Sequence, residues 1–395
     1  MFKNWIFYVL ILVFSCTNTQ EDSEKLNHVS NISNIYITSD SVITFEKKSP
    51  ILIYFNDTSN IAWEAVARCR GGFTAKYPKH SYSIDFKDSV KMLDKKLYET
   101  DWRLISSYND KSFIRHTLSY GLFRDLNPKN KSPHFKYYNL FLNYKPKGLY
   151  ILMEKMGKAK FEQNENTVTE IYKDPHVFRK RLDSVFYNGE GATNFHRVKY
   201  PKNQIEKLNL KMDTIRTFML KSSKTDFNKK IPEIFDLNSI IDWHLHILIT
   251  NNGDGISKNF YLYQQNEKYK IALWDCDNTF GRDGDNEKAE FKKAEIKNNI
   301  LIDKLLEYNT QNYKEKLKAK FNSLVQNKVI TPDQINTKIE SLINLFESGL
   351  EQNFKIWPVN SKYYKDEDDF VTDIIYIKGW YKKHLEYCID YVNSI

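Results

Sequence analysis

The first 160 residues contain short apolar runs that are separated by turn-forming residues. Six of these runs are rich in β-branched and aromatic side chains: residues 35–38, 51–55, 63–69, 81–86, 137–143 and 148–153. Such composition, with apolar and polar positions alternating in several of the runs, is typical of strands that are buried on one face. The pattern therefore predicts a β-rich N-terminal part.

The pattern changes to a helical period further along the chain. Residues 111–126 place Ile114 and Leu118 on one stripe, and residues 236–250 repeat this spacing. Apolar positions three or four residues apart predict amphipathic helices. Residues 287–395 are mainly helical by the same criterion. Together with the strands, these helices predict an α+β protein whose C-terminal part is helical.

A compact group of polar residues follows the second predicted helix. Asp254 and, five residues later, Asn259 precede a predicted hairpin at residues 260–274, and Asp275 and Asp277 stand at its far end. Residues two apart on a strand face the same side. Carboxylate and amide oxygens are ligands for Mg²⁺, and phosphoryl transfer needs such a metal together with a carboxylate beside the attacking hydroxyl.

Three interpretations of these acidic residues remain open on spacing alone. They are kinase-like phosphoryl transfer, another metal-dependent hydrolysis, and an inert structural cluster. In the hydrolytic case Asp254 and Asp277 would act as acid and base on a glycosidic bond. An EF-hand is excluded because residues 283–285 lack its twelve-residue ligand pattern.

Composition supports a globular protein and gives little information about partners. The chain has 395 residues, 41% of them hydrophobic, which is ample for a packed core. The net charge is +9, but lysines are spread along the chain and mixed with acidic residues. A general preference for anions follows, whereas a nucleic-acid site does not.

The N-terminus predicts export. Lys3 precedes an apolar run at residues 5–14 that is too short to span a membrane as a helix. Ser15 and Cys16 follow it and resemble the lipobox of bacterial lipoproteins. We therefore expect residues 1–15 to be a signal peptide, Cys16 to carry the lipid and residues 16–30 to be a tether. The protein would be a membrane-anchored lipoprotein of a bacterial cell envelope, on its periplasmic or surface face.

Seven short motifs are distributed over residues 60–285: residues 77–82, 102–104, 108–115, 148–155, 198–201, 252–259 and 274–281. Together they resemble the spore-coat protein H (CotH) family of atypical, secretory-type protein kinases. The resemblance implies a divergent kinase-like fold at residues 31–285, with residues 286–395 as a helical subdomain packed on this core. It also implies that ATP is bound with Mg²⁺ or Mn²⁺ and that Ser or Thr of a protein substrate is phosphorylated.

The resemblance assigns a role to each candidate residue. Asp254 is the catalytic aspartate, Asn259 and Asp277 are metal ligands, and Asp275 is an alternative or second ligand. The remaining candidates are residues for the nucleotide: Lys79 for a phosphate contact, Glu154 as its ion-pair partner or a further metal contact, and Arg115 as a support for the phosphates.

This chain departs from the family pattern near its glycine loop. His80 stands where the family usually has a second lysine, and residues 71–74 lack the usual pair of serines. Asp254, Asn259 and Asp277 are all present, which argues against an inactive kinase. The alternative functions are a catalytically silent surface-binding or adhesin protein of the same fold and a carboxylate-dependent glycosidase.

Overall fold

The structure, a computed structural model, describes residues 32–57, 61–90, 99–162, 167–180, 194–283, 286–290, 299–359, 362–364 and 366–395. The predicted signal peptide, tether and lipidated Cys16 lie outside these residues. Among the described residues, no helix combines the length and the apolar character that a membrane span requires.

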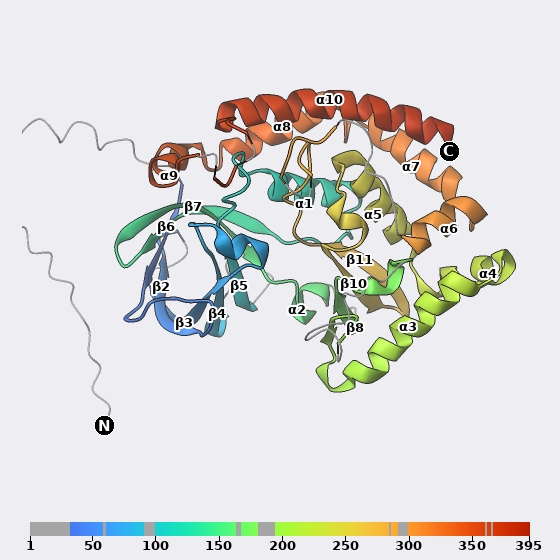
Figure 1. Ribbon diagram of the computed structural model, residues 1–395, viewed down its shortest axis with the longest axis horizontal. Helices are drawn as coiled ribbons and strands as arrows, with labels where there is room; N and C mark the ends of the chain where they lie inside the picture. Colours follow the sequence, from blue (N-terminus) through green and yellow to red (C-terminus); the bar gives the residue numbers. More distant parts are fainter. Residues whose placement is uncertain are drawn as a thin grey trace, which may run out of the picture.

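The strands of the N-terminal part form a closed barrel (Figure 1). Its strands, in spatial order, are β1 (Asn34–Thr38), β2 (Ser49–Phe55), β3 (Trp63–Arg70), β4 (Ser81–Val90), β5 (Glu99–Ile105), β7 (Lys145–Glu154) and β6 (Phe135–Leu142). Neighbours are antiparallel except β1 and β6, which pair in parallel and close the barrel. Ile51, Ile53 and Phe55 alternate with more exposed residues along β2, so one face of the strand fills the interior.

A second sheet lies beside the barrel and has the order β11-β10-β8-β9. Its strands are β8 (Val168–Lys173), β9 (Val198–Tyr200), β10 (Phe260–Gln265) and β11 (Lys268–Leu273). The predicted hairpin is present as β10 and β11, with Phe260 opposite Leu273. The residues before β10 and after β11 therefore leave the sheet at the same end.

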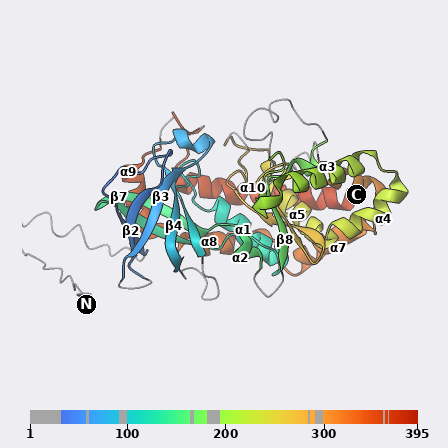
Figure 2. The same cartoon turned by 90° about the horizontal axis from the view of Figure 1, so that it is seen from below.

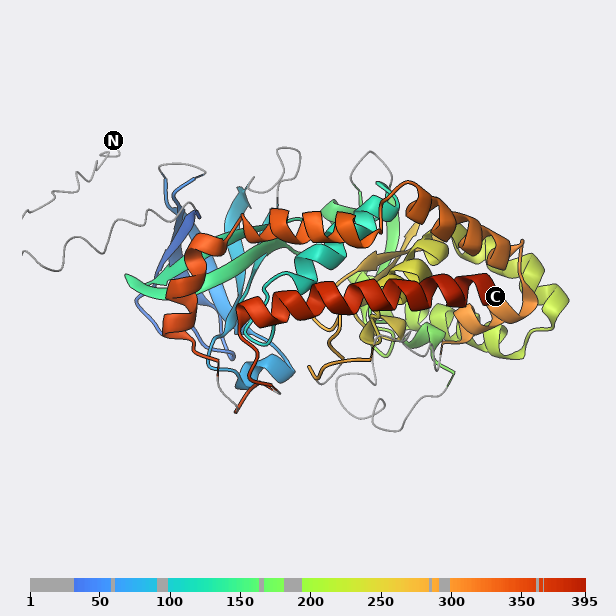
Figure 3. The same cartoon turned by 90° about the horizontal axis from the view of Figure 1, so that it is seen from above.

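Helices surround this sheet and extend along the molecule. They are α1 (Arg115–Leu126), α2 (Lys158–Phe161), α3 (Ile205–Lys221), α4 (Lys224–Ile234), α5 (Leu237–Thr250), α6 (Ile300–Tyr308), α7 (Tyr313–Gln326), α8 (Pro332–Ile343), α9 (Leu350–Ile356) and α10 (Phe370–Ser394). Helix α10 packs on α5, α7 and α8 and runs along the long axis (Figure 3), while α9 packs on β7. Figure 2 shows α3 and α4 at the end of the molecule opposite the barrel.

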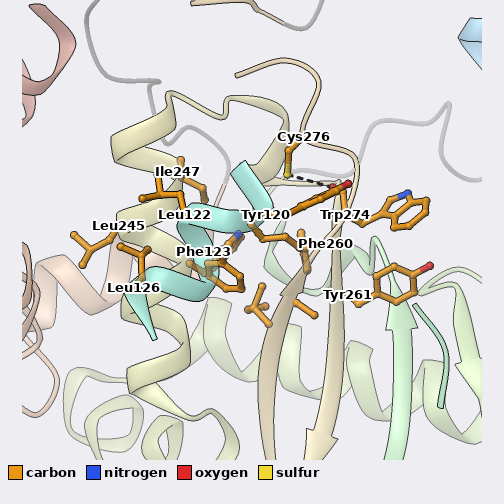
Figure 4. Close-up of a cluster of buried hydrophobic side chains, with 14 of the residues drawn as sticks. Tyr120, Leu122, Phe123, Leu126, Leu245, Ile247, Phe260, Tyr261, Trp274 and Cys276 are labelled. Carbon is orange, nitrogen blue, oxygen red and sulfur yellow. Dashed lines mark hydrogen bonds between the residues drawn. The ribbon is translucent and has the colours of Figure 1, made fainter. Parts of the chain in front are cut away.

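Two apolar cores correspond to these parts. One fills the barrel, and a larger one lies among the helices and the second sheet. Figure 4 shows part of the larger core, with Phe123 of α1 between α5 and the hairpin residue Phe260. The predicted α+β class, with a β-rich N-terminal and a helical C-terminal part, is confirmed.

The predicted helix at residues 111–126 begins four residues later than its apolar pattern suggests. The carboxylate of Asp110 accepts hydrogen bonds from the backbone amides of Ser112 at 3.1 Å and Arg115 at 3.0 Å. Phe113 has a positive φ of 59°. A tight turn therefore precedes α1, because a residue with positive φ cannot continue a right-handed helix.

A buried ion-pair network joins this turn to the C-terminal helix. Arg115 donates to Asp110 at 2.6 Å and to both carboxylate oxygens of Asp373 at 2.7 and 2.9 Å. Arg282 donates to the same carboxylate at 2.8 Å. Although burial raises the pKa of Asp373, the charges of Arg115 and Arg282 hold it far below its usual value. The carboxylate is ionised and fixes α1, α10 and the loop after β11 together.

We expect Asp373→Ala to lower the free energy of unfolding by about 3–5 kcal/mol, because two buried guanidinium groups lose their shared counter-ion. Chemical denaturation of the full chain measures the loss. Asp390→Ala, on the exposed face of α10, is the matched control and should change stability by less than about 0.5 kcal/mol. Equal losses in the two variants would contradict the role assigned to Asp373.

Candidate active site

The acidic loop begins where α5 ends. Asn251 has a left-handed conformation with φ of 54°, which stops the helix. The side-chain oxygen of Asn252 accepts a hydrogen bond from the amide of Gly255 at 2.8 Å. A Cβ at Gly255 would lie 2.6 Å from the side-chain nitrogen of Asn252, so glycine fits here without a shift of the Asn252 side chain. The loop thereby holds Asp254 in a single-turn helix directly before β10.

The turn after β11 is held by two residues of α1. The amide of Asp275 donates to the Tyr120 hydroxyl at 3.0 Å, and the amide of Cys276 donates to His116 Nδ1 at 3.0 Å. His116 and Tyr120 are four residues apart and therefore lie on one face of the helix. Asp275 has a positive φ of 56°, an uncommon conformation that these contacts support.

The carboxylates of this turn lie close to the acidic loop. One ligand atom each of His116, Asp275 and Asp277 lies within 4.8 Å of the others. Asp277 accepts a hydrogen bond from Asn109 at 2.9 Å. Burial raises the pKa of Asp277, and the charges of Asp275 and Asp254 raise it further. Like charges have been brought together at a half-buried site, and this arrangement favours a bound cation.

Asp254 and Asn259 flank this pair of carboxylates. Asp254 accepts a hydrogen bond from Asn278 at 3.2 Å and forms an ion pair with Lys258 at 3.0 Å. The backbone oxygen of Asn259 accepts the amide of Trp274 at 3.2 Å, so Asn259 stands at the end of the hairpin from which Asp275 emerges. The predicted acidic set is thus gathered around the ends of α5, β10 and β11.

The donor set fits a hard cation bound through oxygen. His116 Nδ1 accepts a backbone N–H, so the proton of its neutral ring is on Nε2, the nitrogen that faces Asp275 at 3.9 Å. A protonated nitrogen cannot ligate a metal. His116 is therefore not counted among the metal ligands, and its Nε2 is too far from Asp275 for a hydrogen bond. Asp275 and Asp277 supply the oxygen ligands that suit Mg²⁺ or Mn²⁺.

A comparison with known protein families identifies the family of this chain. The family described as CotH kinase protein matches residues 67–393, which is most of the chain. The chain belongs to the CotH family. The resemblance carried by its motifs is confirmed, and membership marks the chain as kinase-like.

Two known proteins show how far the similarity of this CotH family member extends. The inner spore coat protein H of Bacillus subtilis (strain 168) is 23% identical over 263 residues, which are 65% of this chain and 70% of that protein. A distant structural likeness, with a TM-score of 0.33 and 10% identity, is to a Shewanella oneidensis MR-1 toxin–antitoxin complex of HipA, HipB and operator DNA. It covers 87% of this chain and 77% of that one.

The CotH motif residue Lys79 is buried and away from solvent. Its ammonium donates to the carbonyl of Ser106 at 2.9 Å, to the carbonyl of Leu149, and to the side-chain oxygen of Asn353 at 2.9 Å. Burial lowers the pKa of Lys79 well below its ordinary value. All three donors of the ammonium are used within the protein, so the structure gives Lys79 a structural position.

Glu154 has other partners than the predicted Lys79. It forms a buried ion pair with Lys160 and accepts the amide of His134 at 2.7 Å. Burial raises the pKa of Glu154, but the hydrogen bond from His134 and the charge of Lys160 outweigh it and lower the pKa. The expected Lys79–Glu154 ion pair is therefore absent, because the ammonium of Lys79 and the Oε1 oxygen of Glu154 have other partners. The Oε2 oxygen of Glu154 is buried without a hydrogen-bond partner among the described residues.

Arg115 is likewise committed to the protein. Besides its two aspartates it donates through Nε to the carbonyl of Thr279 at 3.1 Å. Its side chain is 1% exposed. The motif at residues 108–115 did mark the right segment, but Asn109 and the neighbouring His116 are the residues that face the acidic site. Sequence reasoning missed both, since their contacts lie more than 150 positions away.

We expect Lys79→Met to lower thermal stability and leave nucleotide affinity within about twofold of the wild type. The substitution removes the ammonium from two buried carbonyls, at a cost of about 1–3 kcal/mol for each acceptor left without a donor, while Asn353 Oδ1 keeps the amide of Leu149. Calorimetric titration with ATP and Mg²⁺, beside a thermal melt, separates the two effects. A tenfold loss of affinity with an unchanged melting temperature would return Lys79 to the nucleotide site.

Proposed function

We propose that this CotH family member is an exported protein kinase that transfers the γ-phosphate of ATP to Ser or Thr of protein substrates. The observation that carries the proposal is that Asp275 and Asp277 share the turn after β11 and that Asp254, from the loop after α5, lies close enough for its charge to raise the pKa of Asp277. The backbone of Asn259 lies at the same end of the hairpin. Phosphoryl transfer depends mainly on positioning and charge stabilisation, and this set offers oxygen ligands and a carboxylate for the acceptor.

The roles divide by environment. Asn278 and Lys258 hold Asp254 beside the carboxylates of the acidic turn. In this position Asp254 receives the proton of the attacking hydroxyl. Asp277, Asp275 and Asn259 hold a divalent metal, Mg²⁺ or Mn²⁺. When bound, this metal neutralises negative charge on the phosphates. The barrel and the helical part correspond to the two lobes of a divergent kinase-like fold.

The proposal includes the cell envelope. Its support is the N-terminal sequence, with Lys3, the apolar run and Cys16 after a small residue. A lipid on Cys16 would hold the catalytic part at a membrane through residues 16–30.

We expect Asp254→Asn and Asp277→Asn to reduce phosphate transfer by about 10²–10⁴-fold, the usual contribution of a proton acceptor or a charge-stabilising group. The full-length chain is incubated with γ-labelled ATP, Mg²⁺ or Mn²⁺, and a general protein substrate. Asp390→Asn is the charge-matched control. Equal labelling in all variants contradicts the kinase, and sugar release that persists without ATP supports the glycosidase instead.

For the anchor, Cys16→Ser should abolish incorporation of labelled palmitate and move the full-length protein from the detergent phase to the aqueous phase. Cys69→Ser, a buried cysteine within β3, serves as the matched control and should leave both readouts unchanged. Palmitate incorporation that survives Cys16→Ser would refute lipidation at this residue.

A further inference from the structure

Two cations lie over one tryptophan at the acidic turn. The guanidinium carbon of Arg70 is 5.8 Å from the centroid of the Trp274 ring, and the ammonium of Lys173 is 5.2 Å from it. Trp274 is directly followed by Asp275. The charge of Asp275 acts on Lys173, so this cation lies near the carboxylates that are proposed to hold the metal.

The two cations come from different sheets. Arg70 ends β3 of the barrel, and Lys173 ends β8 of the second sheet. Tyr261 of β10 packs edge-on against Trp274 with ring centroids 6.2 Å apart, and Figure 4 shows these two rings side by side. The two rings therefore lie where a cation from the barrel and a cation from the second sheet come together.

Among the described residues, no carboxylate is in direct contact with either cation. In the described part of the chain, Arg70 and Lys173 have no ion pair within 4.0 Å, and both side chains are half-buried. Burial lowers the pKa of Lys173, and the positive charges of Arg70 and Lys199 lower it as well. The carboxylates of Asp174 and Asp275 raise the pKa but do not outweigh these effects. Arg103 also lies near Arg70. Burial is the main cause that lowers the pKa of Arg103, and the charge of Arg70 lowers it further.

Such an arrangement is costly unless an anion is bound. Half-buried like charges repel one another, and attraction to an aromatic face offsets only about 0.5–2 kcal/mol of this cost. The cations lie beside the carboxylates rather than in contact with them, which leaves both groups available to one polyanionic ligand. A metal-bound polyphosphate has this chemistry, because its oxygens contact a metal on one side and cations on another.

We propose that Arg70 and Lys173 bind the polyphosphate of the nucleotide, with Trp274 and Tyr261 fixing their positions. The proposal rests on the proposed function and replaces Lys79 and Arg115, whose donors are used within the protein, as the phosphate contacts. Arg103 is a weaker candidate because it already donates to the carbonyl of Trp102 at 2.7 Å.

The test is calorimetric titration of the full-length protein with three probes: ATP with Mg²⁺, inorganic tripolyphosphate with Mg²⁺, and adenosine. Lys173→Met and Arg70→Gln should each raise the Kd for ATP and for tripolyphosphate about tenfold, the effect of one charge-assisted contact. Affinity for adenosine should stay unchanged. Lys173→Arg, which keeps the charge, should restore most of the affinity.

Lys304→Met is the matched control. Lys304 belongs to α6, away from the acidic turn, and its ammonium also lies over an aromatic ring, 5.4 Å from the centroid of Tyr308. Wild-type affinity for ATP in both Lys173→Met and Arg70→Gln overturns the proposal. If the wild type binds tripolyphosphate through these residues but transfers no phosphate, the anion site stands and the kinase function fails.

Discussion

The shared carboxylate of Asp373 is the contact on which the geometry of the acidic site depends. It binds Arg115 at the start of α1 and Arg282 after the acidic turn, and it comes from α10 near the end of the chain. All three side chains are at most 2% exposed, so their charges are weakly screened and poorly hydrated. The beginning of α1 therefore has one favourable position relative to the loop after β11.

The position of α1 in turn determines the position of the acidic turn, because residues of α1 hold this turn. One turn of α1 places His116 and Tyr120 on the face that holds the amides of Asp275 and Cys276. A shift of α1 would release the turn in which Asp275 has positive φ, and with it the separation of Asp275 from Asp277. The C-terminal helix, which contributes no residue to the acidic set, is in this way part of its support.

Lys79 performs a comparable task in the barrel. It and the side chain of Asn353 in α9 meet the backbone of β7, since Asn353 also accepts the amide of Leu149 at 3.2 Å. Four cations near the barrel and the acidic turn thus fall into two groups. Those whose donors are all used join distant segments, as Lys79 and Arg115 do, while Arg70 and Lys173 keep their charge beside the acidic turn.

The sequence by itself determined the elements and the acidic set. Strand and helix periods depend on local spacing, and a hairpin places Asn259 and Asp275 at one end whatever surrounds it. The tertiary structure alone decided which cation serves which purpose. Lys79 and Asn353 are 274 positions apart, and Arg115 and Asp373 are 258 apart. The partner of a buried charge is set by desolvation and by segments brought together in folding, and no local pattern carries that information.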